Sequence, residues 1–107
     1  MTITLTERDD NRRIQARVGD TLEVRLPEIA SAGYRWSPDD LDPSLFEVKD
    51  VGADYPDRAV GAGGQAIFRI TVRTVGTGTL RLKYWRPWEG EVGVQRRFAV
   101  EVEAAEP

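Results

Sequence analysis

The segment QAIFRITVRT, residues 65–74, carries the clearest structural pattern in the chain. Apolar side chains alternate with polar ones, with Ala66, Phe68, Ile70 and Val72 on one side and Arg69, Thr71 and Arg73 on the other. Successive side chains of a strand point to opposite faces of a sheet. The segment therefore predicts a strand with one face in an apolar core and the other in solvent.

The same two-residue period recurs on both sides of this segment. It is found at residues 13–18, 21–26, 34–36, 45–51, 79–84 and 96–103, with glycine- or proline-marked turns between them. About seven short strands at near-regular spacing, without any sustained helical period, predict an all-β antiparallel sandwich or barrel. The predicted core includes Leu22, Val24, Trp36, Phe68, Ile70, Leu82, Phe98 and Val100.

The length of 107 residues fits one domain, covering residues 1–107, of which we expect 102–107 to form a frayed tail. No apolar run is long enough to span a bilayer, and the start lacks the apolar block of a secretion signal. We therefore expect no membrane association. The default expectation for location is the cytoplasm, unless the numbering begins at a mature exported form.

Charge and composition exclude several function classes. Fifteen basic and eighteen acidic residues are interspersed, and basic residues such as Arg81 and Lys83 alternate along a predicted strand, as expected of an outward face. This distribution is unlike the basic patch that binds nucleic acid. The sequence holds neither cysteine nor histidine, so thiol nucleophiles, thiolate metal sites and histidine general bases are excluded. We predict a binding protein with no catalytic residue, no metal and no cofactor.

Three marked loops are expected at one end of the molecule. If the predicted strands are lettered A to G and successive strands run antiparallel, the B–C loop (residues 27–33), the D–E loop (56–64) and the F–G loop (86–93) emerge together. The F–G loop begins within the stretch YWRPWEG, residues 84–90. Pro87 interrupts the strand ladder because it has no amide donor, and we expect Trp88 to be displayed between Pro87 and Gly90. The alternative is that Trp88 folds back onto the sheet with Arg86 stacked on an indole.

The stretch GAGGQA, residues 61–66, formally matches a dinucleotide fingerprint. That motif requires a strand before it and a helix after it within a parallel α/β unit. Here an alternating strand follows at once, so we read the glycines as a turn or as bare backbone that approaches another protein.

The motifs GYRW (33–36), GAGG (61–64) and YWRPWEG (84–90) resemble, in order and rough spacing, those of the chagasin family. This family comprises immunoglobulin-like protein inhibitors of papain-type cysteine peptidases. The resemblance covers most of the chain and implies an immunoglobulin-like sandwich, no enzymatic activity, and a papain-like cysteine peptidase as partner of a monomeric inhibitor. The family B–C loop typically reads Asn-Pro-Thr-Thr-Gly-aromatic, whereas residues 29–32 here are Ile-Ala-Ser-Ala, so its stiffening proline is absent.

The resemblance also implies which residues bind the peptidase. The central wedge would consist of Ser31, Ala32, Gly33 and Tyr34. The unprimed side of the cleft would be contacted by Gly61, Gly63 and Gly64, and the primed side by Arg86, Pro87 and Trp88.

Other function classes remain as alternatives. The same loops would suit an immunoglobulin-like adhesion or assembly module. Tyr34, Trp85 and Trp88 would suit a carbohydrate-stacking platform. Asp39, Asp40 and Asp42 would suit a carboxylate enzyme, although we expect a solvated turn at the end opposite the loops; a calcium site there or at residues 9–11 lacks the required ligand spacing.

Overall fold

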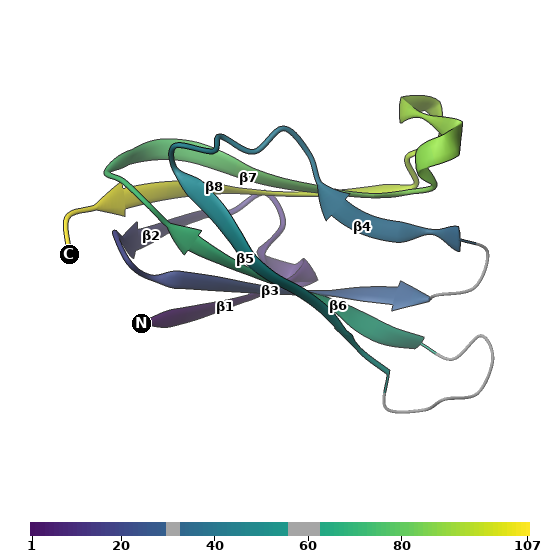
Figure 1. Cartoon of the computed structure of the whole chain (residues 1–107), viewed down its shortest axis with the longest axis horizontal. Coiled ribbons are helices and arrows are strands. Elements are labelled where there is room, and N and C mark those ends of the chain that lie inside the picture. Colours follow the sequence, from purple (N-terminus) through teal and green to yellow (C-terminus); the bar gives the residue numbers. More distant parts are fainter. Residues whose placement is uncertain (30–32, 56–62) are drawn as a thin grey trace.

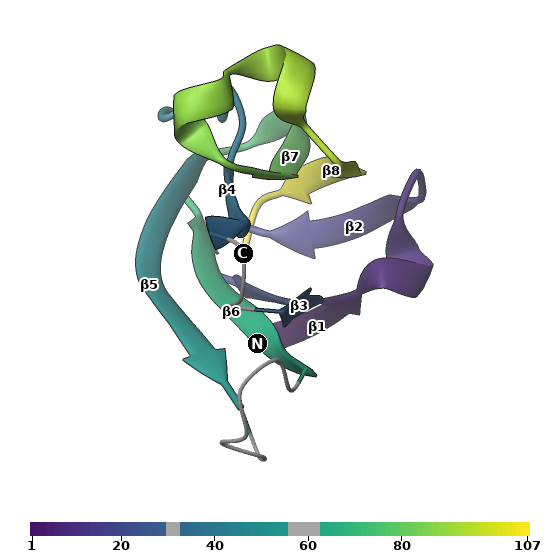
Figure 2. The ribbon, with the colours of Figure 1, turned by 90° about the vertical axis from the view of Figure 1, so that its right-hand side faces the viewer.

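In the computed structural model, which describes residues 1–29, 33–55 and 63–107, the chain forms two four-stranded sheets packed face to face (Figures 1 and 2). One sheet has the order β1-β3-β6-β5 and the other β2-β8-β7-β4. The strands are β1 (Thr2–Thr6), β2 (Arg13–Arg17), β3 (Thr21–Ile29), β4 (Arg35–Pro38), β5 (Phe46–Asp54), β6 (Gly63–Val72), β7 (Gly76–Trp85) and β8 (Arg96–Ala105). Short 3-10 turns form η1 (Glu7–Asp9), η3 (Pro87–Glu89) and η4 (Glu91–Gly93).

The core lies between the two sheets and confirms the predicted alternation. All eight residues predicted for it are buried: Leu22, Val24, Trp36, Phe68, Ile70, Leu82, Phe98 and Val100. The segment that decided the prediction is β6, which lies in the middle of its sheet and pairs antiparallel with both β3 and β5. The sandwich fold class predicted from the sequence is therefore correct.

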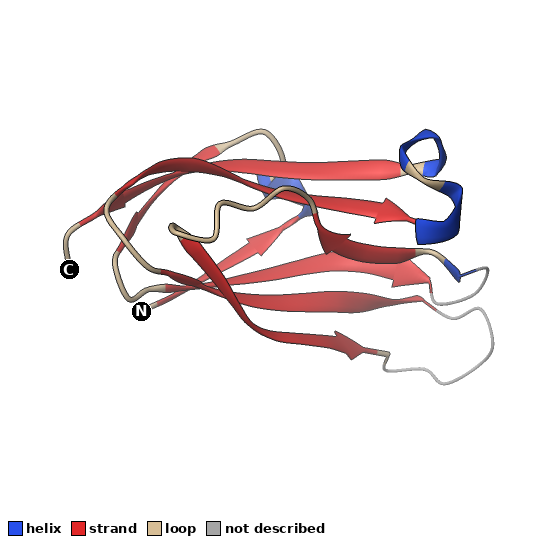
Figure 3. Cartoon of the chain, turned by 45° about the horizontal axis from the view of Figure 1, so that its top comes forward, coloured by secondary structure: helices blue, strands red, loops and turns tan. Residues whose placement is uncertain are grey.

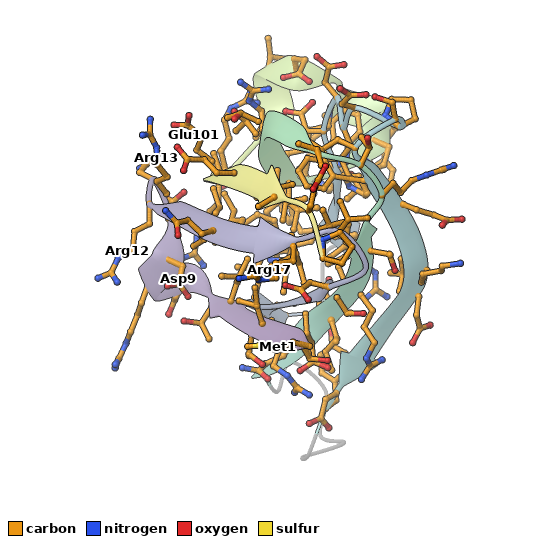
Figure 4. All side chains as sticks on the ribbon, turned by 90° about the vertical axis from the view of Figure 1, so that its left-hand side faces the viewer. Met1, Asp9, Arg12, Arg13, Arg17 and Glu101 are labelled. Carbon is orange, nitrogen blue, oxygen red and sulfur yellow. The ribbon has the colours of Figure 1, made fainter. Side chains whose placement is uncertain are left out.

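Two details of strand pairing differ from the prediction. The described residues form eight strands, because residues 2–6 add β1, and two of the pairs are parallel: β1 with β3 and β2 with β8. The N-terminal segment is split by η1, so β1 completes the edge of one sheet and β2 the edge of the other. Figure 4 shows Arg13 of β2 beside Glu101 of β8, and an ion pair at 3.2 Å joins them across this edge.

The prediction of a frayed tail over residues 102–107 is wrong for residues 102–105. Strand β8 continues to Ala105, and the side chains of Val102 and Ala104 are buried. The parallel pairing with β2 explains this, because Ile14 lies opposite Val102 and Ala16 opposite Ala104. Pairing with the N-terminal strand gives the last residues backbone partners.

Candidate functional site

At one end of the sandwich lie the ends of β3 and β5, the starts of β4 and β6, and the η3–η4 segment between β7 and β8; both chain termini lie at the other end (Figures 1 and 3). Where β3 ends and β6 begins, Ile29 lies opposite Gly63, and where β7 gives way to β8, Tyr84 lies opposite Arg96. The predicted clustering of the B–C, D–E and F–G loops is confirmed for their described flanks. Of the residues predicted to bind, Ser31, Ala32 and Gly61 lie outside the described residues.

A column of aromatic rings connects the core with this end. The buried ring of Trp36 lies 5.2 Å from the ring of Tyr84, which lies 5.5 Å from that of Tyr34. The Tyr84 hydroxyl donates to the Ile29 carbonyl oxygen at 3.1 Å and accepts from the Ile29 amide at 3.3 Å. The side-chain amide of Gln95 donates to the Tyr34 hydroxyl at 3.0 Å. The rings thus tie the end of β3 to β4 and β7.

Arg86 extends this column outward to the F–G loop. Its guanidinium carbon lies 4.5 Å from the ring centroid of Tyr34 and 6.0 Å from that of Trp88. Its Nε and Nη2 donate to the two carboxylate oxygens of Glu89 at 2.8 and 2.6 Å. These hydrogen bonds raise the pKa of Arg86 and lower that of Glu89, so both groups stay charged in mildly acidic solution.

Trp88 is displayed, as the sequence predicts. Its side chain is 72% exposed. Pro87 stands at the start of η3, and Gly90 ends this turn with a φ of 72°, a conformation that favours glycine. The exposed Trp88 ring nevertheless contacts Gly33, since a Cβ built on Gly33 would lie within 3.2 Å of two atoms of the ring. The F–G loop therefore touches the last residue of the B–C loop.

The arrangement of the rings does not suit a carbohydrate platform. Trp85 is held on the sheet, where its indole NH donates to the Ser37 hydroxyl at 2.8 Å and the ammonium of Lys83 lies 3.7 Å from its ring centroid. One face of Tyr34 is covered by Arg86. Of the three rings predicted for stacking, Trp88 is the one with most of its surface exposed.

An ion-pair network fixes the second half of the F–G loop. The Glu91 carboxylate of η4 accepts from Lys83 at 2.7 Å and from Arg97 at 2.8 Å, and both cations also pair with Asp39. These hydrogen bonds lower the pKa of Glu91 and raise those of Lys83 and Arg97. The network anchors η4 to β7 and β8.

Two predictions are corrected by this network. Lys83, expected on an outward face, is only 9% exposed, because η4 and the Trp85 ring cover it. The acidic stretch 39–42 does not lie wholly at the end opposite the loops, since Asp39 shares its partners with Glu91. Asp42 instead accepts from the amide and hydroxyl of Ser44 at 2.9 and 2.7 Å.

A buried carboxylate at the base of the D–E loop was not predicted from the sequence. Glu28 is 5% exposed and accepts from the Tyr55 hydroxyl and, at 3.3 Å, from Arg35. Burial and the hydrogen bond to Glu28 raise the pKa of Tyr55 to about 12. The Tyr55 ring packs on Gly64 so closely that a Cβ there would overlap it. Because Gly64 has no side chain, the Tyr55 ring fits against it, and the Tyr55 hydroxyl joins the end of β5 to Glu28 of β3.

Val92 is a further residue that the sequence analysis missed. It is 98% exposed within η4, on the loop that also displays Trp88. Val92 follows the glycine of YWRPWEG in a segment without periodic alternation, so the sequence pattern did not indicate its exposure. In the structure its neighbour Glu91 anchors the turn that displays it.

The described ranges contain no group of three or more acidic side chains placed to hold a metal ion. In the same ranges, no helix is long and apolar enough to cross a membrane. Asp9 accepts from the Thr6 amide at 2.8 Å and so caps η1, whereas Asp10 accepts from the Ala99 amide of β8 at 2.9 Å.

Comparison with known proteins gives a consistent result. The family model described as "Chagasin family peptidase inhibitor I42" matches residues 15–102. Chagasin of Trypanosoma cruzi is 28% identical over 109 residues, covering 97% of this chain and 99% of the relative. Amoebiasin-1 of Entamoeba histolytica is 29% identical over 100 residues, covering 94% and 97%. The crystal structure of a cysteine protease inhibitor from Entamoeba histolytica shares the fold, with a TM-score of 0.86, 24% identity and coverage of 97% and 96%.

Proposed function

The chain belongs to the chagasin family of peptidase inhibitors, and on this premise we propose that it inhibits papain-type cysteine peptidases reversibly, by placing the B–C, D–E and F–G loops in the active-site cleft. It is an inhibitor and not an enzyme. Family membership favours this function over that of an adhesion or assembly module.

The observation that carries the proposal is the display of Trp88. An indole that is 72% exposed stands on a turn fixed by Pro87, by the Arg86–Glu89 pair and by the anchored η4. Tryptophan is among the residues most enriched at binding hot spots. A rigid turn also loses little conformational entropy on binding, which favours affinity.

The proposed contact surface keeps the assignment made from the sequence. It comprises Ser31, Ala32, Gly33 and Tyr34 of the central wedge, Gly61, Gly63 and Gly64 of the D–E loop, and Arg86, Pro87 and Trp88 of the F–G loop. For Ser31, Ala32 and Gly61 the assignment rests on the sequence alone. Arg86 lies against the Tyr34 ring, and the Trp88 ring lies against Gly33.

The mechanism follows from what the site lacks. The chain has no cysteine or histidine, and the proposed surface holds no group that would react with the thiolate of the peptidase. Inhibition therefore depends on filling the cleft and excluding substrate. A monomer suffices for this, since a complex of ordinary size buries about 1,600 Å² in total over both partners.

Calorimetric binding to three forms of papain tests the proposal. We expect one molecule to bind active papain, and binding to disappear when a covalent peptide-like inhibitor already fills the cleft. A papain form whose catalytic thiol carries only a small methylthio group should still bind, since that group leaves most of the cleft open. Equal binding to papain with a filled cleft would contradict occlusion.

A further inference from the structure

Resting on the proposed function, we propose that Arg86 and Glu89 are positioning residues. Glu89 orients the Arg86 guanidinium between the rings of Tyr34 and Trp88. Arg86 in this orientation joins the F–G loop to the end of the B–C loop, and the two form one preformed binding surface.

The geometry of the Arg86 side chain is the first argument. Both carboxylate oxygens of Glu89 accept from it, at 2.8 and 2.6 Å, and a two-point pairing of this kind fixes the plane of a guanidinium as well as its position. In that orientation the guanidinium carbon lies 4.5 Å from the Tyr34 ring centroid. Glu89 therefore holds the guanidinium in the orientation in which it lies on Tyr34.

The second argument is that Tyr34 is itself a fixed support. Its ring lies on Tyr84, whose ring lies on the buried Trp36, and its hydroxyl accepts from Gln95 at 3.0 Å. Arg86 is thus connected through the rings of Tyr34 and Tyr84 to Trp36 of the core. A side chain on such a support loses less freedom on binding than one on an open loop.

The third argument is the contact between the Trp88 ring and Gly33. The Trp88 ring lies against the bare backbone of Gly33, with Arg86 beside both residues. The Arg86 Cδ is the third-nearest atom to a Cβ built on Gly33, at 3.7 Å. One side chain therefore touches the end of the B–C loop, Tyr34 and the displayed indole.

A test in the free protein addresses the positioning role without any peptidase. In nuclear magnetic resonance spectra, the ring of Trp88 should shift the Hα signals of Gly33, and the ring of Tyr34 should shift the Hδ signals of Arg86, which take no part in the hydrogen bonds to Glu89. We expect Glu89→Gln, which removes the charge and keeps the shape, to move both signals towards their positions in Trp88→Ala and Tyr34→Leu respectively. Glu47→Gln, on the distant β5, is the control and should leave them in place. Unchanged signals in Glu89→Gln would overturn the proposal.

A test with papain addresses the consequence for binding. We expect Glu89→Gln to raise the inhibition constant about tenfold, mainly through slower association, because the loops must then order during binding. The double variant Arg86→Gln/Glu89→Gln should be no worse than the more affected single variant, since the two residues act as one unit. Additive losses would show two independent peptidase contacts and overturn the positioning role. If the unaltered protein fails to inhibit, the proposed function fails, while the spectra still decide whether the pair joins the two loops.

Discussion

A Cβ built on Gly33 would lie 2.5 Å from the Cη2 atom of Trp88, so the indole at the tip of the F–G loop rests on a backbone position that only glycine leaves open. Gly33 also has a φ of 79°, where side chains other than glycine are strained. The contact joins two of the three loops proposed to enter a peptidase cleft, and it makes the display of Trp88 depend on a residue 55 positions earlier.

The variant Gly33→Ala should therefore lose both stability and inhibition. The strain at positive φ should cost about 1–2 kcal/mol of unfolding free energy, and the displaced indole should weaken papain inhibition at least tenfold. Gly19→Ala is the matched control, because Gly19 has a φ of 95° with no atom within 4 Å of a built Cβ. It should lose similar stability in urea and keep its inhibition constant. Equal losses of inhibition in both variants would show that the contact with Trp88 is immaterial.

Truncating the displayed indole separates binding from stability. Trp88→Ala should weaken the inhibition of papain by roughly tenfold to nearly a thousandfold, the range for aromatic hot spots. Its melting temperature should change little, since a ring that is 72% exposed contributes little buried surface. Ser31→Ala should weaken inhibition less, because water can replace one hydroxyl. A collapse of the melting temperature would show that the indole belongs to the core.

A cavity introduced in the central strand β6 should lower the stability of the protein. Phe68 of β6 is fully buried, and Phe68→Ala should lower the free energy of unfolding by about 3–5 kcal/mol in urea titrations. Val51→Ala is the control on the neighbouring strand β5: Val51 lies opposite Phe68 in the register but is exposed, so the change should stay within about 0.5 kcal/mol. An unchanged urea midpoint for Phe68→Ala would contradict its burial.

The hydrogen bond between the half-buried Tyr55 and the buried Glu28 should make stability depend on pH in alkaline solution. The folded protein raises the pKa of Tyr55 from 10 to about 12, so above pH 10 the unfolded chain loses the phenolic proton first. The stability from this group is complete below pH 10 and is lost as the pH rises towards 12. Tyr55→Phe should weaken the fall of stability between these pH values, whereas Tyr34→Phe should retain it. Tyrosinate absorbance that lacks a step near 12 would count against the buried hydrogen bond.

The sequence was sufficient for features that depend on strand parity. Phe68 and Ile70 are buried and Trp88 is displayed because alternation and the interruption at Pro87 act locally. The sequence did not predict the pairing between distant segments. Nothing in residues 2–6 or 13–17 indicates that the N-terminal segment is divided between two sheets and pairs in parallel. Lys83 was placed outward because parity alone cannot show that Glu91 and Trp85 will cover it. Glu28 and Tyr55, 27 positions apart, meet only after β3, β5 and β6 have assembled.

The central claim, reversible occlusion of a papain-type cleft, is tested most directly by titrating active papain with the protein and then recovering the inhibitor. We predict that papain activity falls in proportion to added protein up to one equivalent and returns when the complex is diluted far below its dissociation constant. Mass spectrometry of the recovered inhibitor should show the segment 30–34 intact. Full papain activity in the presence of a large excess of the protein would contradict inhibition. Loss of inhibition in step with cleavage within residues 30–34 would replace occlusion with slow turnover of a substrate.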